Sequence, residues 1–315
     1  MTDQRQPPQT MPIPCDTMGG HGDHWQALSL TPQHDVPRWL QAAIDDAIVP
    51  RGLHPTSDSL PPDHWLLQGP SSQMLRLTQL LDVDHNQQPI RMRNAYPCID
   101  SPHWRNVRIQ RILHCDERGE AILSLETEDG INLHAFDTLY AIQKDCYDAN
   151  TTYQASLGAI AYGLEKVGSD EKMRVDDPAA IRHHRALNDI LAANDGIAPD
   201  DLQAQLDAWQ PKGPEDQEPV MLDLSRMAAY LFGEHFGQED EAWFQGEVIG
   251  KQVIDFLGQP VCVFDVVILR EDPDQPLVIA VACSTHALDG LEITVGDFVR
   301  GNIWMQVEIH AKSVP

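Results

Sequence analysis

The sequence predicts an α+β, β-rich protein with two small barrel-like antiparallel modules, OB-like or similar, and a helical segment between them. Three observations predict this class. Short runs that alternate apolar and polar residues, separated by turn residues, fill two stretches of the chain. Helical periodicity with capping signals fills the stretch between them. The length of 315 residues also suits two domains, taking roughly 150 residues for each.

Changes in composition divide the chain into four parts. The first is an arm rich in Pro, Gln, Gly and His, either flexible or draped over the surface, which ends in one helix. The second and fourth are the β modules, and the third is a linker with helices. The expected boundaries are 1–60 for the arm and helix, 61–167 for the first β module, 168–239 for the helical segment and 240–315 for the second β module.

Capping residues and apolar spacing predict the helices. Asp35 is expected to cap the first helix, with Pro37 in its first turn. Asp177 followed by Pro178 predicts the start of a second helix, and a shorter third one is expected to end near Trp209. A fourth helix is expected over residues 222–232, before Gly233.

Alternating residues predict the strands. In the first module, strands are expected at 107–113 and 121–125, with a closing strand at 153–164. The second module is expected to hold five strands, at 248–254, 261–269, 277–282, 293–295 and 298–309. Gly296 and Asp297 suggest a sharp turn before the last strand, because glycine tolerates positive φ and aspartate bonds nearby amides. A small barrel would protect the strand edges.

Weak internal similarities leave two alternatives open. Leu66-Leu67-Gln68-Gly69 matches Trp243-Phe244-Gln245-Gly246, and Gln88-Pro89-Ile90 matches Gln259-Pro260-Val261. The segments that lead into the closing strands near Tyr153 and Phe298 are also alike. These matches indicate either a duplicated β module or chance similarity, because short matches with apolar positions are common.

The charge of the chain bears on its partners. The formal net charge is -26, from 48 acidic and 22 basic residues. Such an excess repels phosphate backbones and anionic membrane surfaces, so neither nucleic acid nor membrane is expected as a partner. The excess serves either solubility alone or a protein partner with a basic face.

Cysteines and apolar segments bear on the compartment. None of the six cysteines forms a C-x-x-C pair, and Cys262 and Cys283 lie within apolar runs, so buried free thiols are expected. The N-terminal residues lack a secretory apolar segment, and no run reaches the roughly 18 apolar residues that a membrane helix needs. A cytoplasmic protein is expected.

Motifs for catalysis, cofactors and metals are weak. The common phosphate-binding, dinucleotide, nucleophile-elbow and zinc-protease signatures are missing from the sequence, so no catalytic residue is assigned and no cofactor is expected. His21-Gly22-Asp23-His24 brings two imidazoles and a carboxylate together, but zinc sites use three or four protein ligands and no partner cluster stands out. No metal site is expected.

Two tryptophans are the candidate contact residues. Trp304 points outward if Ile303 and Met305 form the core face, and inward in the opposite phase, where it would cover the interface to the preceding helices. Trp243 follows an acidic segment at the start of the second module. The leading hypothesis is therefore a non-enzymatic binding or protein-interaction module. The alternative is an enzyme whose site is built from distant residues in a cleft between the two β modules.

Overall fold

The structure, a computed structural model, describes residues 12–54, 61, 63–233, 235–270 and 275–312. The chain forms two units. Residues 1–166 and 228–315 form the ring unit, and residues 167–227 form the insert unit. Within the described residues, no helix combines the length and the apolar character needed to cross a membrane.

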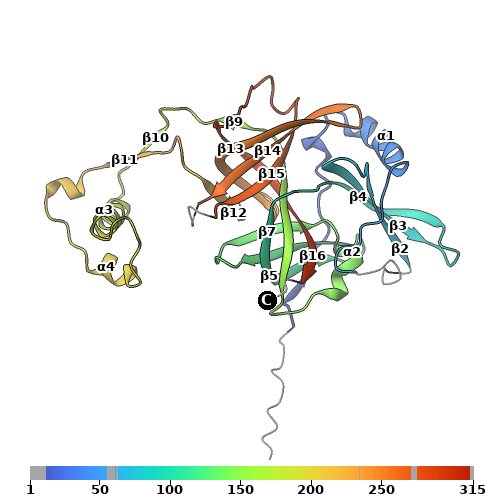
Figure 1. The fold of residues 1–315 in the computed structure, drawn as a ribbon, viewed down its shortest axis with the longest axis horizontal. Helices are drawn as coiled ribbons and strands as arrows, with labels where there is room; N and C mark the ends of the chain where they lie inside the picture. The colour runs from blue at the N-terminus through green and yellow to red at the C-terminus, as the bar shows by residue number, and fades with distance from the viewer. Residues whose placement is uncertain (1–11, 55–60, 62, 234, 271–274, 313–315) are drawn as a thin grey trace, which may run out of the picture. The chain divides into compact units, whose positions relative to one another are not determined.

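Ten strands of the ring unit pair along one continuous path, in the order β1-β5-β6-β7-β16-β8-β15-β14-β13-β12 (Figure 1). Two further pairings, β5 with β8 and β13 with β16, close this path into two rings. The strands β8 and β16 belong to both rings. The bounds are β1 Cys15–Thr17, β5 Trp104–Cys115, β6 Glu120–Thr127, β7 Asn132–Asp137, β8 Thr152–Ala161, β12 Ala229–Phe232, β13 Glu241–Phe256, β14 Gln259–Leu269, β15 Leu277–Ser284 and β16 Phe298–Lys312.

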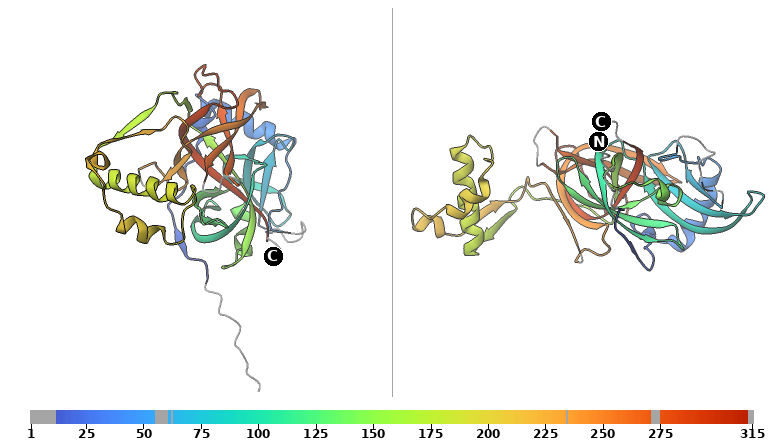
Figure 2. Two further views of the ribbon diagram at one scale, coloured as in Figure 1. Left: turned by 60° about the vertical axis from the view of Figure 1, so that its left-hand side comes forward. Right: turned by 90° about the horizontal axis from the view of Figure 1, so that it is seen from below.

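The first ring is β5-β6-β7-β16-β8, and the second is β13-β14-β15-β8-β16. The first half of the unit supplies β5 to β8, and the second half supplies β13 to β16. The first three strands of each half belong to one ring, and the last strand of each half belongs to both rings. The third strand of each half pairs in parallel with the last strand of the other half, β7 with β16 and β15 with β8. Figures 1 and 2 show the red β16 running from the orange strands to the green ones.

The registers of the two rings also correspond. Five consecutive pairs join β5 to β8, from Trp104–Ser156 to Arg108–Thr152. Seven consecutive pairs join β13 to β16, from Glu241–Trp304 to Glu247–Phe298, and the last five of these, from Trp243–Asn302 onward, correspond to the five of the first ring. Shortly after these pairs each first strand has one irregularity, at Gln110 in β5 and at Ile249 in β13. Aligning the irregularities places Trp104 on Trp243. The same alignment carries the pair Ile122–Phe136 onto Val263–Ala282.

The observed strands differ from the second predicted module in two ways. The described residues between 240 and 312 supply four strands rather than five, and β8 from the first half completes their ring. The expected strand at 293–295 is a turn, because the Asp297 carboxylate accepts a hydrogen bond from the Thr294 amide at 2.7 Å. Gly296 has the predicted positive φ, at 92°. The sharp entry into β16 is therefore confirmed.

Alternation explains which face of each strand is buried. Along β8, Tyr153, Ala155, Leu157 and Ala159 belong to the core of the rings, together with Ile303 and other residues of β16. A strand with period two buries every second side chain on one face. Cys262 and Cys283 are buried free thiols, as predicted.

A second layer covers the rings on one side. It consists of a three-stranded antiparallel sheet, β2-β3-β4, and helix α1. Trp39 and Ala43 of α1 pack with Leu75 and Leu77 of β3 in one buried cluster, which also contains Trp304. The bounds are β2 His64–Gly69, β3 Leu75–Val83, β4 Pro89–Ile99 and α1 Pro32–Ile44. Shorter elements of this unit are η1 Trp25–Ala27, α2 Tyr140–Gln143, η3 Lys144–Cys146 and β9 Glu165–Lys166.

The predicted cap of the first helix is wrong. Helix α1 begins at Pro32, after Thr31, so Asp35 lies in its first turn. The Asp35 carboxylate accepts hydrogen bonds from the hydroxyls of Ser29, at 2.5 Å, and Thr31, at 3.1 Å. These residues precede the helix, so the carboxylate ties the helix to the chain before it. The helix also ends before Ile48, which forms a β-bridge with Gln68.

The insert unit leaves and rejoins the ring unit through paired strands. β10 and β11 are antiparallel, and Lys172 lies opposite Asp223. Helix α3 begins as predicted, because the Asp177 side chain accepts a hydrogen bond from the Ala180 amide at 2.8 Å. Its core is small, with Ala186, Ile190 and Leu206 buried. The bounds are β10 Lys172–Val175, α3 Pro178–Ala193, α4 Leu202–Ala208, η4 Pro214–Gln217 and β11 Val220–Asp223.

The helix predicted over residues 222–232 is wrong. Two short strands, β11 and β12, occupy this stretch instead. β11 pairs with β10, and β12 pairs with β13 through Tyr230–Phe244 and its neighbours. The apolar residues of this stretch have helical spacing, but pairing with strands that are distant in sequence stabilises the extended conformation instead.

Candidate functional site

The N-terminal segment, residues 12–31, lies on the ring unit. Its strand β1 pairs in parallel with β5, from Cys15–Ile112 to Thr17–His114. Further along, the His21 amide donates a hydrogen bond to Glu120 Oε1 at 2.6 Å. Ser284 donates a hydrogen bond to the Ala27 carbonyl at 3.0 Å. Of the two sequence-based alternatives, the draped segment therefore holds for these residues.

The segment places His21 against a buried carboxylate. His21 Nε2 lies 2.8 Å from Asp240 Oδ2, and the two side chains are 1% and 0% exposed. The indole N–H of Trp304 donates a hydrogen bond to the same oxygen at 2.8 Å. The contact between His21 and Asp240 is a buried ion pair when the imidazole is protonated.

His24 connects this buried group to the surface. Its ring stacks on Trp304, with 4.4 Å between ring centres, and lies 4.8 Å from the ring of His21. His24 Nδ1 contacts the Tyr162 hydroxyl, which donates a hydrogen bond to Glu241 Oε1 at 2.5 Å. Because the phenolic proton goes to Glu241, His24 Nδ1 is the donor to Tyr162. The buried Nε2 of His24 then has no hydrogen-bond partner among the described residues.

The surroundings of His21, His24 and Tyr162 shift their pKa values in different directions. Burial, followed by the neighbouring His21, lowers the pKa of His24 to about 4. Burial also opposes the charged form of His21, but Asp240 outweighs it and the pKa of His21 is raised. Burial, followed by the hydrogen bond to Glu241, raises the pKa of Tyr162 well above its ordinary value. At neutral pH His24 is therefore a neutral imidazole and Tyr162 a protonated phenol.

An open pocket of about 420 Å³ lies beside Tyr162, on the outer face of the second ring. Trp243 of β13 forms one wall, because its neighbours Ala242 and Phe244 point into the core. Gly163 and Gly301 bring two backbones together in the lining, since a Cβ on Gly301 would lie 2.2 Å from the Gly163 carbonyl oxygen. The other lining residues are Leu164, Glu165, Ala287, Arg300 and Asn302.

The two candidate tryptophans differ in their placement. Ile303 and Met305 belong to the core of the rings, which is the phase that turns Trp304 to the outer face of β16. Trp304 is nevertheless fully buried there, against His21, His24 and Phe136, so the exposure expected from that phase is wrong. Trp243 is partly exposed and lines the pocket. A series of contacts leads from Trp304 to this pocket: Trp304 stacks on His24, and His24 contacts Tyr162, which lines the pocket together with Trp243.

Sequence reasoning missed Tyr162 and the carboxylates Asp240 and Glu241. The acidic run Glu239-Asp240-Glu241, one residue before Trp243, was the available signal. Asp240 is completely buried, which carboxylates rarely are without a partner. Nothing in the local pattern places Tyr162 beside His24, because 138 residues separate them.

The structure does not place further metal-ligating side chains around the His21–His24 motif in the described part of the chain. Across the described part of the chain, no group of three or more His, Cys, Asp and Glu side chains has an arrangement suited to a metal ion. The imidazoles of His21 and His24 are engaged instead by Asp240 and Tyr162.

A second pair of reactive residue types lies elsewhere in the ring unit. Cys146 Sγ is 3.7 Å from His54 Nε2, beside an open pocket of about 540 Å³. Burial raises the pKa of the Cys146 thiol, and His54 Nε2 also contacts the Ile142 carbonyl. A nucleophilic cysteine requires a lowered thiol pKa. This pair therefore lacks the activation that covalent catalysis needs.

The comparisons with known proteins returned nothing: no protein-family model, no curated protein and no solved structure matches this chain.

Proposed function

We propose that the protein is a non-enzymatic binding module for a protein segment that carries Lys or Arg, and that the pocket beside Tyr162 and Trp243 is its contact site. The observation that carries this proposal is the pair of aromatic walls with carboxylates beside them. Glu165 lines the pocket, and Glu241 holds the Tyr162 hydroxyl. Aromatic faces and carboxylates together attract cationic side chains.

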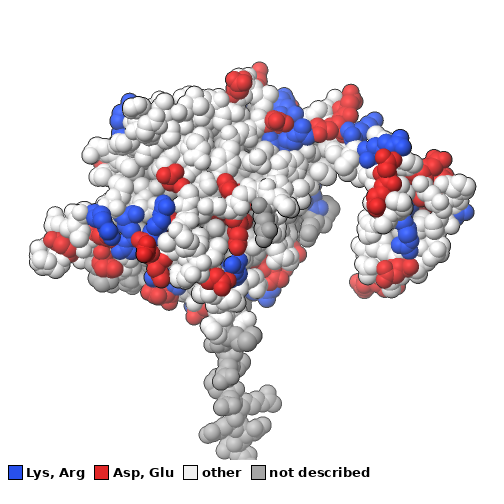
Figure 3. Space-filling model, turned by 180° about the vertical axis from the view of Figure 1, so that it is seen from behind, with Lys and Arg blue, Asp and Glu red and all other residues white. Residues whose placement is uncertain are grey.

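The distribution of charge supports a cationic partner. Most described Lys and Arg side chains of the ring unit already form ion pairs with its own carboxylates, and on the face drawn in Figure 3 blue side chains lie beside red ones. Those ion-paired residues are Arg38, Arg76, Arg91, Arg93, Arg108, Arg111, Arg118, Lys144, Lys166, Arg270, Arg300 and Lys312. With a net charge of -26, the remaining carboxylates give the field around the protein its negative sign.

The pocket contains one cation, Arg300, which must be reconciled with this proposal. Its Nε lies 3.3 Å from Glu165 Oε2, so its charge is compensated within the pocket. The negative charge of Glu241 is not compensated by Arg300. Its oxygens accept hydrogen bonds from two neutral donors, the Tyr162 hydroxyl and the Gln238 amide.

Proton chemistry favours binding over catalysis at this site. An acid or base works best when its pKa is near the pH of the reaction. The pKa of His24 is lowered to about 4 and that of Tyr162 is raised well above its ordinary value. His21 and Asp240 are buried away from the pocket. These groups suit a fixed binding wall better than the enzyme alternative.

We also propose that the two rings descend from one duplicated β module. The matching strand order, register and irregularity support this, as does the reciprocal use of β8 and β16. The alignment pairs β5 with β13. It therefore differs from the sequence match of 66–69 with 243–246, since 66–69 lie in β2 of the separate three-stranded sheet.

Titration of the indole N–H signals tests the proposed function. With a Lys-rich peptide at low salt, we expect the Trp243 signal to shift in an NMR spectrum, and the shift to weaken as salt rises. A Glu-rich peptide of the same length should leave it unchanged. The Trp65 signal, from a partly exposed indole bonded to Gln87, is the internal control.

A charge-matched pair of variants completes the test. Glu165→Gln should weaken binding of the Lys-rich peptide several-fold, whereas Glu117→Gln, which removes the same charge at an exposed position away from the pocket, should not. If the Lys-rich peptide leaves the Trp243 signal in place, the proposed function is wrong.

A further inference from the structure

We infer that the ring unit carries a second contact site of the same kind, centred on Trp104 in the first ring, so that one chain binds two Lys- or Arg-bearing segments. This inference rests on the proposed function of the Trp243 pocket. It is carried by the register of the two rings, which places Trp104 and Trp243 at the same position.

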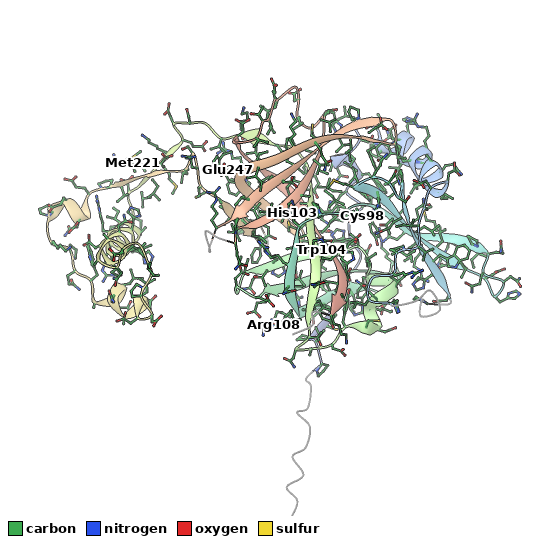
Figure 4. All side chains as sticks on the ribbon, viewed as in Figure 1. Cys98, His103, Trp104, Arg108, Met221 and Glu247 are labelled. Atoms are coloured by element: carbon green, nitrogen blue, oxygen red, sulfur yellow. The ribbon has the colours of Figure 1, made fainter. Side chains whose placement is uncertain are left out.

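The correspondence at this position is close. Trp104 lies opposite Ser156 on β8, and Trp243 lies opposite Asn302 on β16. Both pairs lie four residues before the last pair of their ladder, at Arg108 and Glu247. Figure 4 labels Trp104 and both of these end positions.

Packing does not explain two tryptophans at this position. The inward side chains of these strands build the core, as Val107 does in β5 and Phe244 in β13. Trp104 belongs to the outward set and is 46% exposed. The last pairs of the two ladders also hold outward side chains, and these have opposite charges, Arg108 in the first ring and Glu247 in the second. A tryptophan kept in both rings on the solvent side indicates contact with a partner, for which Trp is strongly enriched.

The surroundings of Trp104 offer the same kinds of groups as the Trp243 pocket. An open pocket of about 430 Å³ is lined by Trp104, its neighbours His103 and Arg105, and Pro276. Asp265 is not among the lining residues, but its Oδ1 lies 2.6 Å from Nε2 of His103, which lines the pocket. The indole ring of Trp104 rests on a second imidazole, with 4.5 Å between the ring centres of Trp104 and His310.

Each site also contains one arginine that the protein itself holds, by different groups. Arg105 donates a hydrogen bond to the neutral Pro276 carbonyl, whereas Arg300 is paired with the Glu165 carboxylate in the other pocket. Each site thus presents an exposed or partly exposed indole, a nearby carboxylate and an arginine that the protein itself holds. The fitting ligand at both is an extended segment with a Lys or Arg side chain that lies over the indole. A partner that presents two such segments would engage both sites of one chain.

Stoichiometry and local signals test the inference together. In a calorimetric titration at low salt, a peptide with a single Lys-rich segment should bind with two equivalents per chain. In the NMR titration, the indole signals of both Trp104 and Trp243 should shift, and the Trp65 signal should stay.

Variants assign the two equivalents. Trp104→Ala should leave one equivalent and the Trp243 shift, and Trp243→Ala should leave one equivalent and the Trp104 shift. Trp65→Ala should retain both equivalents. Trp104→Leu, which keeps apolar volume without the aromatic face, is measured in parallel, and unfolding midpoints confirm that each variant is folded.

The outcomes separate the two proposals. One equivalent with a shift of Trp243 alone would overturn the second site and leave the proposed function standing. Shifts at neither tryptophan would overturn both. Two equivalents that both survive Trp104→Leu would also overturn the second site, because the bound segments would then lie elsewhere.

Discussion

At the scale of single residues, His21 and His24 compete for one proton. Their rings are 4.8 Å apart in a buried setting, and Asp240 lies against His21. Two positive charges at this separation repel strongly where water is excluded. The carboxylate therefore fixes the proton on His21, and His24 stays neutral between Trp304 and Tyr162.

This arrangement predicts how acid affects stability. The folded-state pKa of His24, about 4, lies below the unfolded value near 6.5, so only the unfolded chain takes up this proton in that window. The free energy of unfolding should fall as pH drops from about 6.5 to 4, by up to about 1.4 kcal/mol per pH unit. The raised pKa of His21 affects stability at higher pH. Its contribution to the free energy of unfolding is complete below a pH of about 6.5 and is lost as the pH rises through the folded-state pKa of His21.

Urea unfolding of wild type and His24→Asn at several pH values between 7 and 4 measures this. The variant should be less stable at pH 7 but should lose less stability per pH unit on the acid side. Asparagine suits the left-handed backbone at this position, where φ is 53°. Equal acid slopes in the two proteins would contradict the assignment of the neutral state to His24.

Sequence reasoning reached this site only in part. It singled out His21, His24, Trp243 and Trp304, because each stands out by residue type. It did not connect them, because the contacts that join them span long sequence separations, such as His24 with Tyr162. It also passed over Trp104, whose exposed position follows from the ring geometry rather than from its local pattern.

At the scale of elements, the close crossing beneath the Trp243 pocket depends on glycine. A Cβ on Gly301 of β16 would lie 2.2 Å from the Gly163 carbonyl oxygen, a backbone atom that cannot rotate away. Gly301→Ala should therefore destabilise the protein by roughly 1–3 kcal/mol, the usual cost of overpacking. Gly19→Ala is the matched control, since a Cβ there has open space around it.

Thermal and urea unfolding of both variants measure the difference. The first ring allows a comparison of the two equivalent positions. The register alignment places Ala155 of the first ring at the position that Gly301 occupies in the second ring. An unfolding free energy of Gly301→Ala equal to that of wild type would show that the two backbones can separate.

Elements were predictable where local signals decide them. The start of α3 followed from Asp177 and Pro178, and the sharp entry into β16 from Gly296 and Asp297. The stretch 222–232 was misassigned because its strands are stabilised by β10 and β13, which local periodicity does not report. The exchange of β8 and β16 was likewise invisible, since pairing partners are chosen by the whole fold.

At the scale of the whole molecule, the insert unit should be dispensable for the ring unit. β10 and β11 bring the ends of the insert together, and the Leu224 amide donates to the Glu171 carbonyl at 2.9 Å. Replacing residues 172–223 with a short Gly-Ser linker should leave the ring unit folded, with an unfolding midpoint close to that of the full chain.

Near-UV circular dichroism and thermal unfolding of the shortened chain test this. The excised segment by itself should be largely unfolded, because its core is small for its length. Loss of cooperative unfolding in the shortened chain would contradict the division into two units.

The shared strands also impose an order on biosynthesis. When the first half of the chain leaves the ribosome, β5 to β8 can pair, but β16 is still to be synthesised, so β7 and β8 keep open edges. Unprotected edges template aggregation, and long-range pairing is slow. The first ring can close only after β16, which reaches Lys312, has been synthesised. We therefore expect the exposed edges of β7 and β8 to be prone to aggregation until β16 pairs with them.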